Sequence, residues 1–316
     1  MDTDLHQLAD RFFLDLRLKG RSPATLRSYR WYVGQFLKYL DRESITMACE
    51  ISNEVLKGYH MDLFQRRSLG QCRDAARVQP YLVPVRSFVR FMQREKLLPE
   101  DPVEDLSFPR RHRSLPRVIL SADEMVRLIE APDVSTAIGY RDRTIMELLY
   151  STAIRRNECR SIKIPDLSIE DGLLRVFGKG QKERMVPVGR IALKFLDNYV
   201  LFVRPLFAKR RSEMHLFLSS RGSKMSRNVI GGFIDRYTRQ AGIGKRVTPH
   251  TFRHTCATLM LRNRADIRHI QAMLGHESLE STQIYTHVAV SDLRDVLAKY
   301  HPREQNGNES LPGGAI

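Results

Sequence analysis

A basic stretch interrupted by prolines divides the chain into two parts. Three prolines recur through it, Pro102, Pro109 and Pro116, with arginines at Arg110, Arg111, Arg113 and Arg117. Because proline lacks the backbone N–H donor and breaks helices and central strands, we expect no regular element to cross this stretch. The pattern predicts two domains joined by a basic linker over residues 109–117. A solvated run of charges and a segment that lies across a DNA backbone both fit it.

Apolar residues at helical spacing fill the part before the linker. Ser22-Pro23 is typical of an N-cap residue followed by proline at the first helical position. The series behind it comprises Leu26, Tyr29, Val33, Phe36, Leu37 and Leu40. Two further series are Leu5, Leu8, Phe12 and Leu16, and then Leu82, Val85, Phe88, Val89 and Met92. They predict an N-terminal domain over residues 1–108 that is a bundle of amphipathic helices.

The second domain, expected over residues 118–302, mixes helical and strand patterns. Ser121 to Glu124 form a capping box that opens it, and a helical run follows. Residues 173–177 and 184–188 are predicted to be two strands around a glycine-rich turn, with a hairpin signal at Asp171-Gly172. From Thr251 onward the pattern is helical again, and residues 303–316 are expected to be a disordered tail.

Positive charge is in large excess. The chain holds 52 Lys and Arg against 36 Asp and Glu, a formal net charge of +16. Such a surplus favours a polyanionic partner, with nucleic acid the commonest and an acidic membrane surface the second. No segment is long and apolar enough to span a bilayer, and the first residues lack a signal-peptide pattern. The four cysteines are scattered without a CxxC pair, which fits a reduced, cytoplasmic setting.

Two segments of the second domain place basic residues where the chain is expected to bend. Arg155 follows an apolar helical run near the start of the next helix, where its fork of donors can be aimed at a phosphate. Lys179 lies between Gly178 and Gly180 at the tip of the expected hairpin, from which a lysine can reach a DNA groove or donate a proton. Taken alone, an ordinary surface arginine and an ordinary hairpin turn remain open.

Two later segments add histidines, an arginine and a tyrosine. His250 and Arg253 are three residues apart behind a proline, so both can face one site from a first helical turn. His276 follows Gly275, a plausible residue just past a helix end, and Tyr285 comes nine residues later. Taken alone, a structural histidine and a core tyrosine also fit.

Together these residues suit phosphoryl transfer. Two arginines, a lysine and two histidines can surround one phosphorus centre and neutralise the charge that develops on its nonbridging oxygens. A tyrosine supplies an oxygen nucleophile for a covalent intermediate. His250 and His254 have the spacing of some metal ligands, but the glutamate of an H-E-x-x-H motif is absent and no acidic cluster suggests Mg²⁺ ligands. We therefore expect neither a metal nor another cofactor.

The same residues resemble the signature of the tyrosine recombinase, or phage integrase, family. Arg155 matches the first family arginine, Lys179 the hairpin lysine, His250 and Arg253 the His-x-x-Arg pair, His276 the His/Trp position and Tyr285 the nucleophile. Thr-Ala-Ile precedes Arg155 where the family usually has Thr-Gly-Leu, and Ala153 is strained there if its φ is positive. The resemblance implies a mainly α fold with a small β-hairpin or sheet. It also implies an N-terminal helical core-binding (SAM-like) bundle and a C-terminal tyrosine-recombinase catalytic domain.

For the mechanism, the resemblance implies DNA strand cleavage and rejoining without metal or ATP. Tyr285 would attack the scissile phosphate, forming a 3′-phosphotyrosyl link and freeing a 5′-hydroxyl. Arg155, Arg253 and His276 would hold the nonbridging oxygens, Lys179 would protonate the leaving oxygen, and His250 would assist the tyrosine. Two domains would clamp double-stranded DNA at a specific core site, and a homo- or hetero-tetramer would form the synaptic complex. The protein would be nucleoid-associated when bound.

Several alternatives stay open at this level. The segment with Leu293, Val296 and Leu297 resembles the family's C-terminal helix that docks onto a neighbouring protomer, and packing within its own domain also fits. Size and the lack of an arm-binding domain look more like the Xer type, or a simple transposon or plasmid integrase, than a lambda-type integrase. Outside the recombinases, a DNA-binding accessory protein without catalysis and a type IB topoisomerase are the competing classes.

Overall fold

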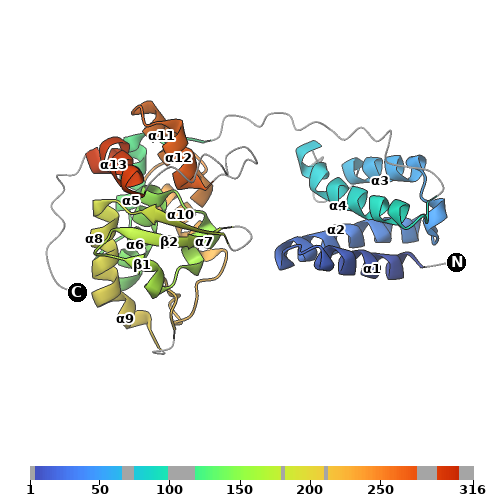
Figure 1. Cartoon of the computed structure of the whole chain (residues 1–316), viewed down its shortest axis with the longest axis horizontal. Coiled ribbons are helices and arrows are strands. Elements are labelled where there is room, and N and C mark those ends of the chain that lie inside the picture. Colours follow the sequence, from blue (N-terminus) through green and yellow to red (C-terminus); the bar gives the residue numbers. More distant parts are fainter. Residues whose placement is uncertain are drawn as a thin grey trace. The chain divides into compact units, whose positions relative to one another are not determined.

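The computed structural model describes residues 4–65, 75–98, 118–178, 182–209, 213–275 and 290–305. The chain forms two compact units, Met1–Leu115 and Pro116–Ile316. Both are mainly helical, and the second also holds a small sheet (Figure 1), so the predicted fold class is confirmed. The stretch predicted as a linker lies outside the described residues. Within those ranges, no helix has the length and apolar character needed to cross a membrane.

The first unit is a bundle whose helices pack around aromatic side chains. Its helices are α1 (Leu5–Leu18), α2 (Pro23–Arg42), α3 (Asn53–Gln65) and α4 (Ala75–Arg94), with a short 3₁₀ turn at Ala48–Glu50. The Ser22 hydroxyl accepts the backbone N–H of Thr25 at 3.2 Å, which confirms the predicted N-cap. Phe12 and Phe88 are fully buried, with ring centres 5.3 Å apart, and join α1 to α4.

The second unit is built around one buried helix, α6 (Ala137–Thr152). Every residue from Thr144 to Ala153 is buried, as expected of a helix that is packed on all sides. Around it lie α5 (Ala122–Glu130), α8 (Arg190–Asn198) and α11 (Pro249–Arg262). The unit also contains α9 (Arg204–Phe207) and α10 (Val229–Gln240), which come between α8 and α11 in the chain. The capping box of α5 is present as predicted, with Ser121 and Glu124 each accepting the other's backbone N–H.

A small antiparallel sheet lies beside this helical core. Its strands are β1 (Leu167–Ser168), β2 (Leu173–Phe177) and β3 (Glu183–Pro187), in that order. The strand predicted over residues 184–188 therefore begins and ends one residue earlier. Leu174 pairs with Val186 and Val176 with Arg184, and the apolar members of these pairs are buried. The hairpin of β2 and β3 carries Gly178 and Lys182 at its end.

The chain's last described segment packs back onto its own unit. It comprises α13 (Val290–Tyr300) and α14 (Pro302–Gln305). Leu293 and Leu297 are buried, so in the single chain this helix packs within its own domain, which is the second of the two alternatives above. The expected tail was wrong at its start, because Arg303 is buried and bonds Glu147 at 2.9 Å. Residues 306–316 lie outside the described residues.

His301 lies buried just before this last helical turn. Its Nε2 lies 3.1 Å from the Tyr150 carbonyl oxygen, and its Nδ1 accepts the Arg303 N–H at 3.2 Å. A neutral ring with its proton on Nε2 satisfies both contacts, whereas a proton on Nδ1 would break the second. Burial lowers the pKa of His301 from 6.5 to about 4.

We expect this histidine to make folding pH-dependent. The pKa of His301 is depressed in the folded state. Its contribution to the free energy of unfolding is therefore fully present above pH 6.5 and is lost as pH falls toward 4. The loss in the free energy of unfolding should be about 3 kcal/mol across that window. Urea denaturation at pH 7 and pH 4.5 measures it. His301→Gln, which does not titrate, should lose clearly less over the same range; equal losses in both proteins would contradict the assignment.

Candidate active site

Arg155 lies at the start of α7 (Arg156–Ser161), as its position after the apolar helix predicted. Its backbone N–H donates to Glu158 Oε2 at 2.9 Å, and its Nη1 donates to Glu158 Oε1 at 2.9 Å. Its side chain is 40% exposed, so part of the guanidinium faces solvent. The arrangement fixes the base of Arg155 while leaving donors available for a ligand.

The bend before Arg155 is made by Ala153 in a left-handed conformation. Its φ of +50° and ψ of +25° end α6, and the residue is fully buried. The sequence departure noted above therefore falls where a side chain is strained. The bend matters for the site because the Ala153 carbonyl accepts a hydrogen bond from Arg253 at 2.8 Å.

Ala153→Gly is expected to stabilise the second unit by about 1 kcal/mol, because glycine avoids the left-handed penalty of an L-residue. The urea midpoint of the full chain measures the change. Ala257→Gly is the matched control, since Ala257 lies within α11 and glycine there should destabilise by about 0.5–1 kcal/mol. A loss of stability in Ala153→Gly would show that the left-handed bend carries no strain.

Arg253 is the buried cation of the site. It lies in the first turns of α11, is 6% exposed, and donates from Nη2 to the Leu274 carbonyl at 2.7 Å as well as to Ala153. Both carbonyls belong to helix ends, at α6 and at α12 (Ile267–Leu274), where the helix dipole favours a cation. Burial, with Arg155 nearby, lowers the pKa of Arg253 to about 10, so it stays protonated at neutral pH.

Two residues absent from the predicted site complete the cluster. Glu158 is buried and accepts from both Arg155 and Arg184, the latter through Nη1 at 3.2 Å and Nη2 at 2.9 Å. Burial works to raise the pKa of Glu158, but hydrogen bonds from Arg184 and the Arg155 backbone outweigh it and hold the pKa below its ordinary value. Two guanidinium groups bind this carboxylate and that of Arg253 interacts with it electrostatically, so these four side chains together carry an excess of positive charge.

The sequence carried a weak signal for both residues. Glu158 is three residues after Arg155, the spacing of a helix-start contact, and Arg184 ends the glycine-rich segment around Lys179. Neither spacing reveals that the two side chains meet.

Of the other four predicted site residues, the structure describes only His250. His250 is exposed on the first turn of α11, one turn before Arg253. Lys179, His276 and Tyr285 lie outside the described residues. The residues that precede two of them lie at the cluster. A Cβ on Gly178 would be 3.9 Å from Glu158 Oε1, and the Gly275 carbonyl accepts from Arg155 Nη2 at 3.3 Å.

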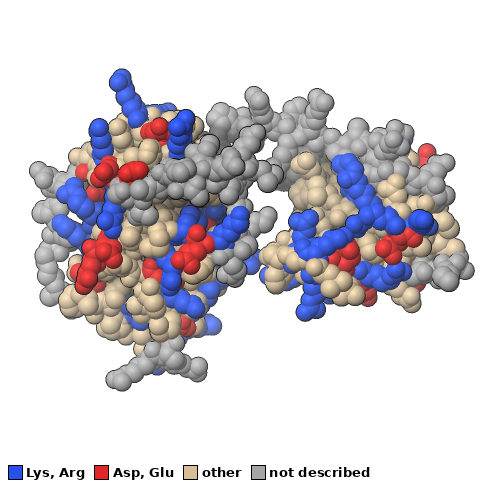
Figure 2. Space-filling view, in the orientation of Figure 1, with Lys and Arg blue, Asp and Glu red and all other residues tan. Residues whose placement is uncertain are grey.

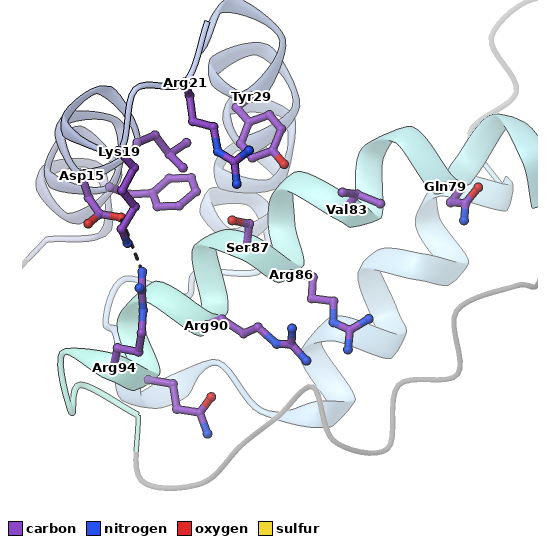
Figure 3. A pocket seen from close by; sticks show the side chains of 13 residues that line it. Asp15, Lys19, Arg21, Tyr29, Gln79, Val83, Arg86, Ser87, Arg90 and Arg94 are labelled. Atoms are coloured by element: carbon purple, nitrogen blue, oxygen red, sulfur yellow. Dashed lines mark hydrogen bonds and ion pairs between the residues drawn. The ribbon is translucent and has the colours of Figure 1, made fainter. Parts of the chain in front are cut away.

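A second basic site lies in the first unit. A cleft of about 620 Å³ runs along α4, lined by Arg86, Arg90 and Arg94 and, opposite, by Lys19 and Arg21. Figure 2 shows Lys and Arg side chains gathered over this unit, and Figure 3 shows the three α4 arginines spaced along one side of the helix. Their spacing of four residues puts them on one face.

One carboxylate partly neutralises the positive charge of this cleft. Asp15 is the single acid among the residues that line the cleft, and it binds Lys19 at 2.7 Å and Arg94 at 3.4 Å. Polar and apolar side chains, Gln79, Ser87 and Val83, lie between the cations. A row of cations with such neighbours suits a nucleic acid, which offers charged phosphates to the cations and base edges to the polar and apolar side chains.

The described parts of the chain bring together no three His, Cys, Asp or Glu side chains that could hold a metal ion. The site instead presents positively charged hydrogen-bond donors, the guanidinium groups of its arginines. A tetrahedral anion placed between Arg155 and Arg253 would meet two guanidinium groups, one half-exposed and one buried, and hydrogen bonds from ionised donors to an anion are stronger than neutral ones.

Comparisons with known proteins agree with this chemistry. Residues 119–292 match the model of the phage integrase family. Tyrosine recombinase XerD of Staphylococcus epidermidis is 36% identical over 293 residues, covering 90% of this chain and 95% of the relative. XerD of Staphylococcus saprophyticus is 36% identical over 311 residues, covering 96% and 100%.

A solved structure has the same fold. A lambda integrase dimer bound to a COC′ core site superposes with a TM-score of 0.67 at 19% identity, over 91% of this chain and 100% of that one. The family model and the XerD relatives show that the chain belongs to the phage integrase family, the tyrosine recombinases, which cleave and rejoin DNA.

Proposed function

We propose that this protein is a site-specific DNA recombinase of the Xer type, with Tyr285 as its nucleophile and Arg155, Lys179, His250, Arg253 and His276 as its other catalytic residues. The XerD relatives, which it matches along 95–100% of their length, favour this type over other integrases. Its partner would be double-stranded DNA with a specific core site, and its place of action the cytoplasm, bound to the nucleoid.

The observation that carries the proposal is the convergence of separate chain segments on one cationic cluster. Arg155 from α7 and Arg253 from α11 are joined through carbonyls at the ends of α6 and α12. Gly178 and Gly275, which directly precede Lys179 and His276, lie at the same cluster. An isolated surface arginine has no need of such a framework, whereas a phosphate site does.

The proposed reaction needs no external energy source, because each bond that breaks is replaced by one of the same kind. The Tyr285 oxygen forms a bond to phosphorus while the bond from phosphorus to the 5′ oxygen breaks. The tyrosine proton passes to a base, with His250 the candidate, and Lys179 gives a proton to the departing 5′ oxygen. One phosphodiester is exchanged for another, so the reverse attack by a 5′-hydroxyl rejoins the strand. Arg155, Arg253 and His276 stabilise the charge on the nonbridging oxygens during transfer.

The cleft on α4 supplies DNA binding in this proposal. Its cations would contact backbone phosphates, and the uncharged side chains between them would lie against base edges. Binding that neutralises phosphates releases counterions, so affinity falls steeply with salt.

Arg90→Ala is expected to lower the slope of log affinity against log salt by about 0.9, the contribution of one phosphate contact. Fluorescence anisotropy with a labelled duplex over a range of salt concentrations measures the slope. Arg42→Ala is the matched control, because Arg42 is an exposed arginine of the same unit that pairs with Asp62 and does not line the cleft. Equal slopes in Arg90→Ala and wild type would remove the cleft from the DNA-binding surface.

Strand cleavage that depends on sequence tests the proposed type. Duplexes from the native locus should be cleaved and scrambled duplexes should not. Relaxation of any supercoiled plasmid at equal efficiency would instead indicate a topoisomerase, and binding without cleavage would indicate an accessory protein.

A further inference from the structure

Arg184 holds together three elements of the active-site region. It lies on β3 opposite Val176, and its side chain is only 17% exposed. Both of its Nη atoms bond Glu158, and Glu158 Oε1 also accepts Arg155 Nη1 at 2.9 Å. Arg184 and Arg155 therefore share one carboxylate, and any displacement of Arg184 is transmitted through Glu158 to Arg155.

Arg184 also packs against two glycines that border predicted catalytic residues. A Cβ on Gly275 would lie 2.9 Å from Arg184 Nε and 3.0 Å from its Cζ, closer than real side chains approach. A Cβ on Gly178 would lie 3.6 Å from Arg184 Nη1. Gly275 has a φ of +61°, a conformation that favours glycine, and a side chain there would displace Arg184.

We propose that Arg184 is a positioning residue for strand cleavage: through Glu158 it orients Arg155, and by packing on Gly275 and Gly178 it fixes the backbone next to His276 and Lys179. The inference rests on the proposed function. Arg184 itself does not have to touch the phosphate, because its two Nη atoms already bind the carboxylate.

Removing Arg184 has two expected consequences at the site. Glu158, whose side chain is 5% exposed, would keep Arg155 as its only side-chain hydrogen-bond partner within the described residues, and without Arg184 it would hold that guanidinium less firmly in place. The space beside Gly275 would also open. Misplacement of a phosphate-binding group by about 1 Å can slow a reaction by about a hundredfold.

The test is a double-mutant cycle in single-turnover cleavage of a nicked duplex substrate by the full chain. Arg184→Ala should cleave about a hundredfold slower than wild type, with DNA affinity nearly unchanged. If Arg184 acts through Arg155, then adding Arg184→Ala to Arg155→Ala should slow cleavage by much less than a hundredfold. Full additivity, or near-normal cleavage by Arg184→Ala, would overturn the proposal.

Arg175→Ala is the matched control. Arg175 lies on β2 of the same sheet and donates from Nε and Nη2 to one oxygen of buried Asp166, at 3.1 and 3.0 Å, outside the cluster. The Arg175→Ala variant should be less stable than wild type and should cleave at the wild-type rate. A similar slowing in Arg175→Ala would mean that general loosening of the sheet, and not positioning, explains the effect of Arg184.

Arg184→Lys keeps the test decisive if Arg184→Ala does not fold. Lysine retains the charge and the apolar stem but cannot bind both Glu158 oxygens in a fork. It should fold normally and still cleave more slowly than wild type, and wild-type cleavage by this variant would contradict the proposal. Absence of cleavage by the wild-type protein itself would count against the proposed function instead.

A pH profile gives an independent readout. Arg184 supplies the strongest of the interactions that lower the pKa of Glu158, against the opposing effect of burial. In Arg184→Ala that pKa should rise, so cleavage should fall off at a higher pH on the acid side than in wild type. An acid limb at the same pH in both proteins would contradict the coupling of Arg184 to Arg155 through Glu158.

Discussion

Tyr285→Phe is expected to abolish DNA cleavage. Phenylalanine lacks the phenolic oxygen, so no bond to phosphorus can form and the covalent route is lost entirely. DNA binding should remain close to that of wild type, because the cleft on α4 and the arginine cluster are unchanged. Incubation of each protein with a nicked duplex, followed by denaturing gels for the covalent complex and native gels for binding, measures both properties.

Tyr300→Phe controls for the loss of a tyrosine hydroxyl as such. Tyr300 ends α13, and its backbone carbonyl, which accepts from Asn263 at 2.9 Å, is retained in the variant. This variant should form the covalent complex at the wild-type rate. Covalent complex in Tyr285→Phe would show that another residue is the nucleophile.

Arg253→Ala should slow cleavage by about 10³-fold, the effect of removing a cationic donor from the transition state of phosphoryl transfer. The size follows from its surroundings. Arg253 is desolvated and held by two carbonyls at 2.7 and 2.8 Å, so its charge needs no reorganisation when a phosphate arrives. Single-turnover rates on the nicked duplex measure the loss.

Arg253→Lys separates charge from geometry. Lysine keeps the positive charge but lacks the planar fork of donors with which arginine contacts Ala153, Leu274 and a phosphate together. Arg253→Lys should therefore recover only part of the cleavage rate. Thermal unfolding of both variants shows whether the carbonyls left unpaired destabilise the second unit. A rate within tenfold of wild type in a folded Arg253→Ala protein would remove Arg253 from the site.

Local sequence patterns predicted the parts of the fold that depend on neighbouring residues. The N-cap at Ser22, the capping box at Ser121 and the left-handed end of α12 at Gly275 all rest on side chains or backbone angles within a few residues. Arg155 lies at the start of α7 for the same reason. These features follow from helix termination chemistry and need no knowledge of the rest of the chain.

Contacts between distant segments could not be predicted in this way. Arg303 looked like part of a polar tail, yet it bonds Glu147, which is 156 positions earlier in the chain and buried. Glu158 and Arg184 meet across 26 positions, and neither charge pattern nor periodicity specifies that pairing. The cleft joins Asp15 on α1 to Arg94 on α4, across 79 positions. Each of these depends on how the helices and strands pack.

The central claim is that Tyr285 forms the covalent link to DNA, and mapping the linked residue tests it most directly. Wild-type protein is trapped on a nicked duplex from its native locus, the complex is digested, and the nucleotide-bearing peptide is sequenced by mass spectrometry. The account predicts a peptide linked through Tyr285 to a 3′-phosphate. A different linked residue, a 5′-phosphate link, or a bound duplex that yields no covalent peptide would contradict it.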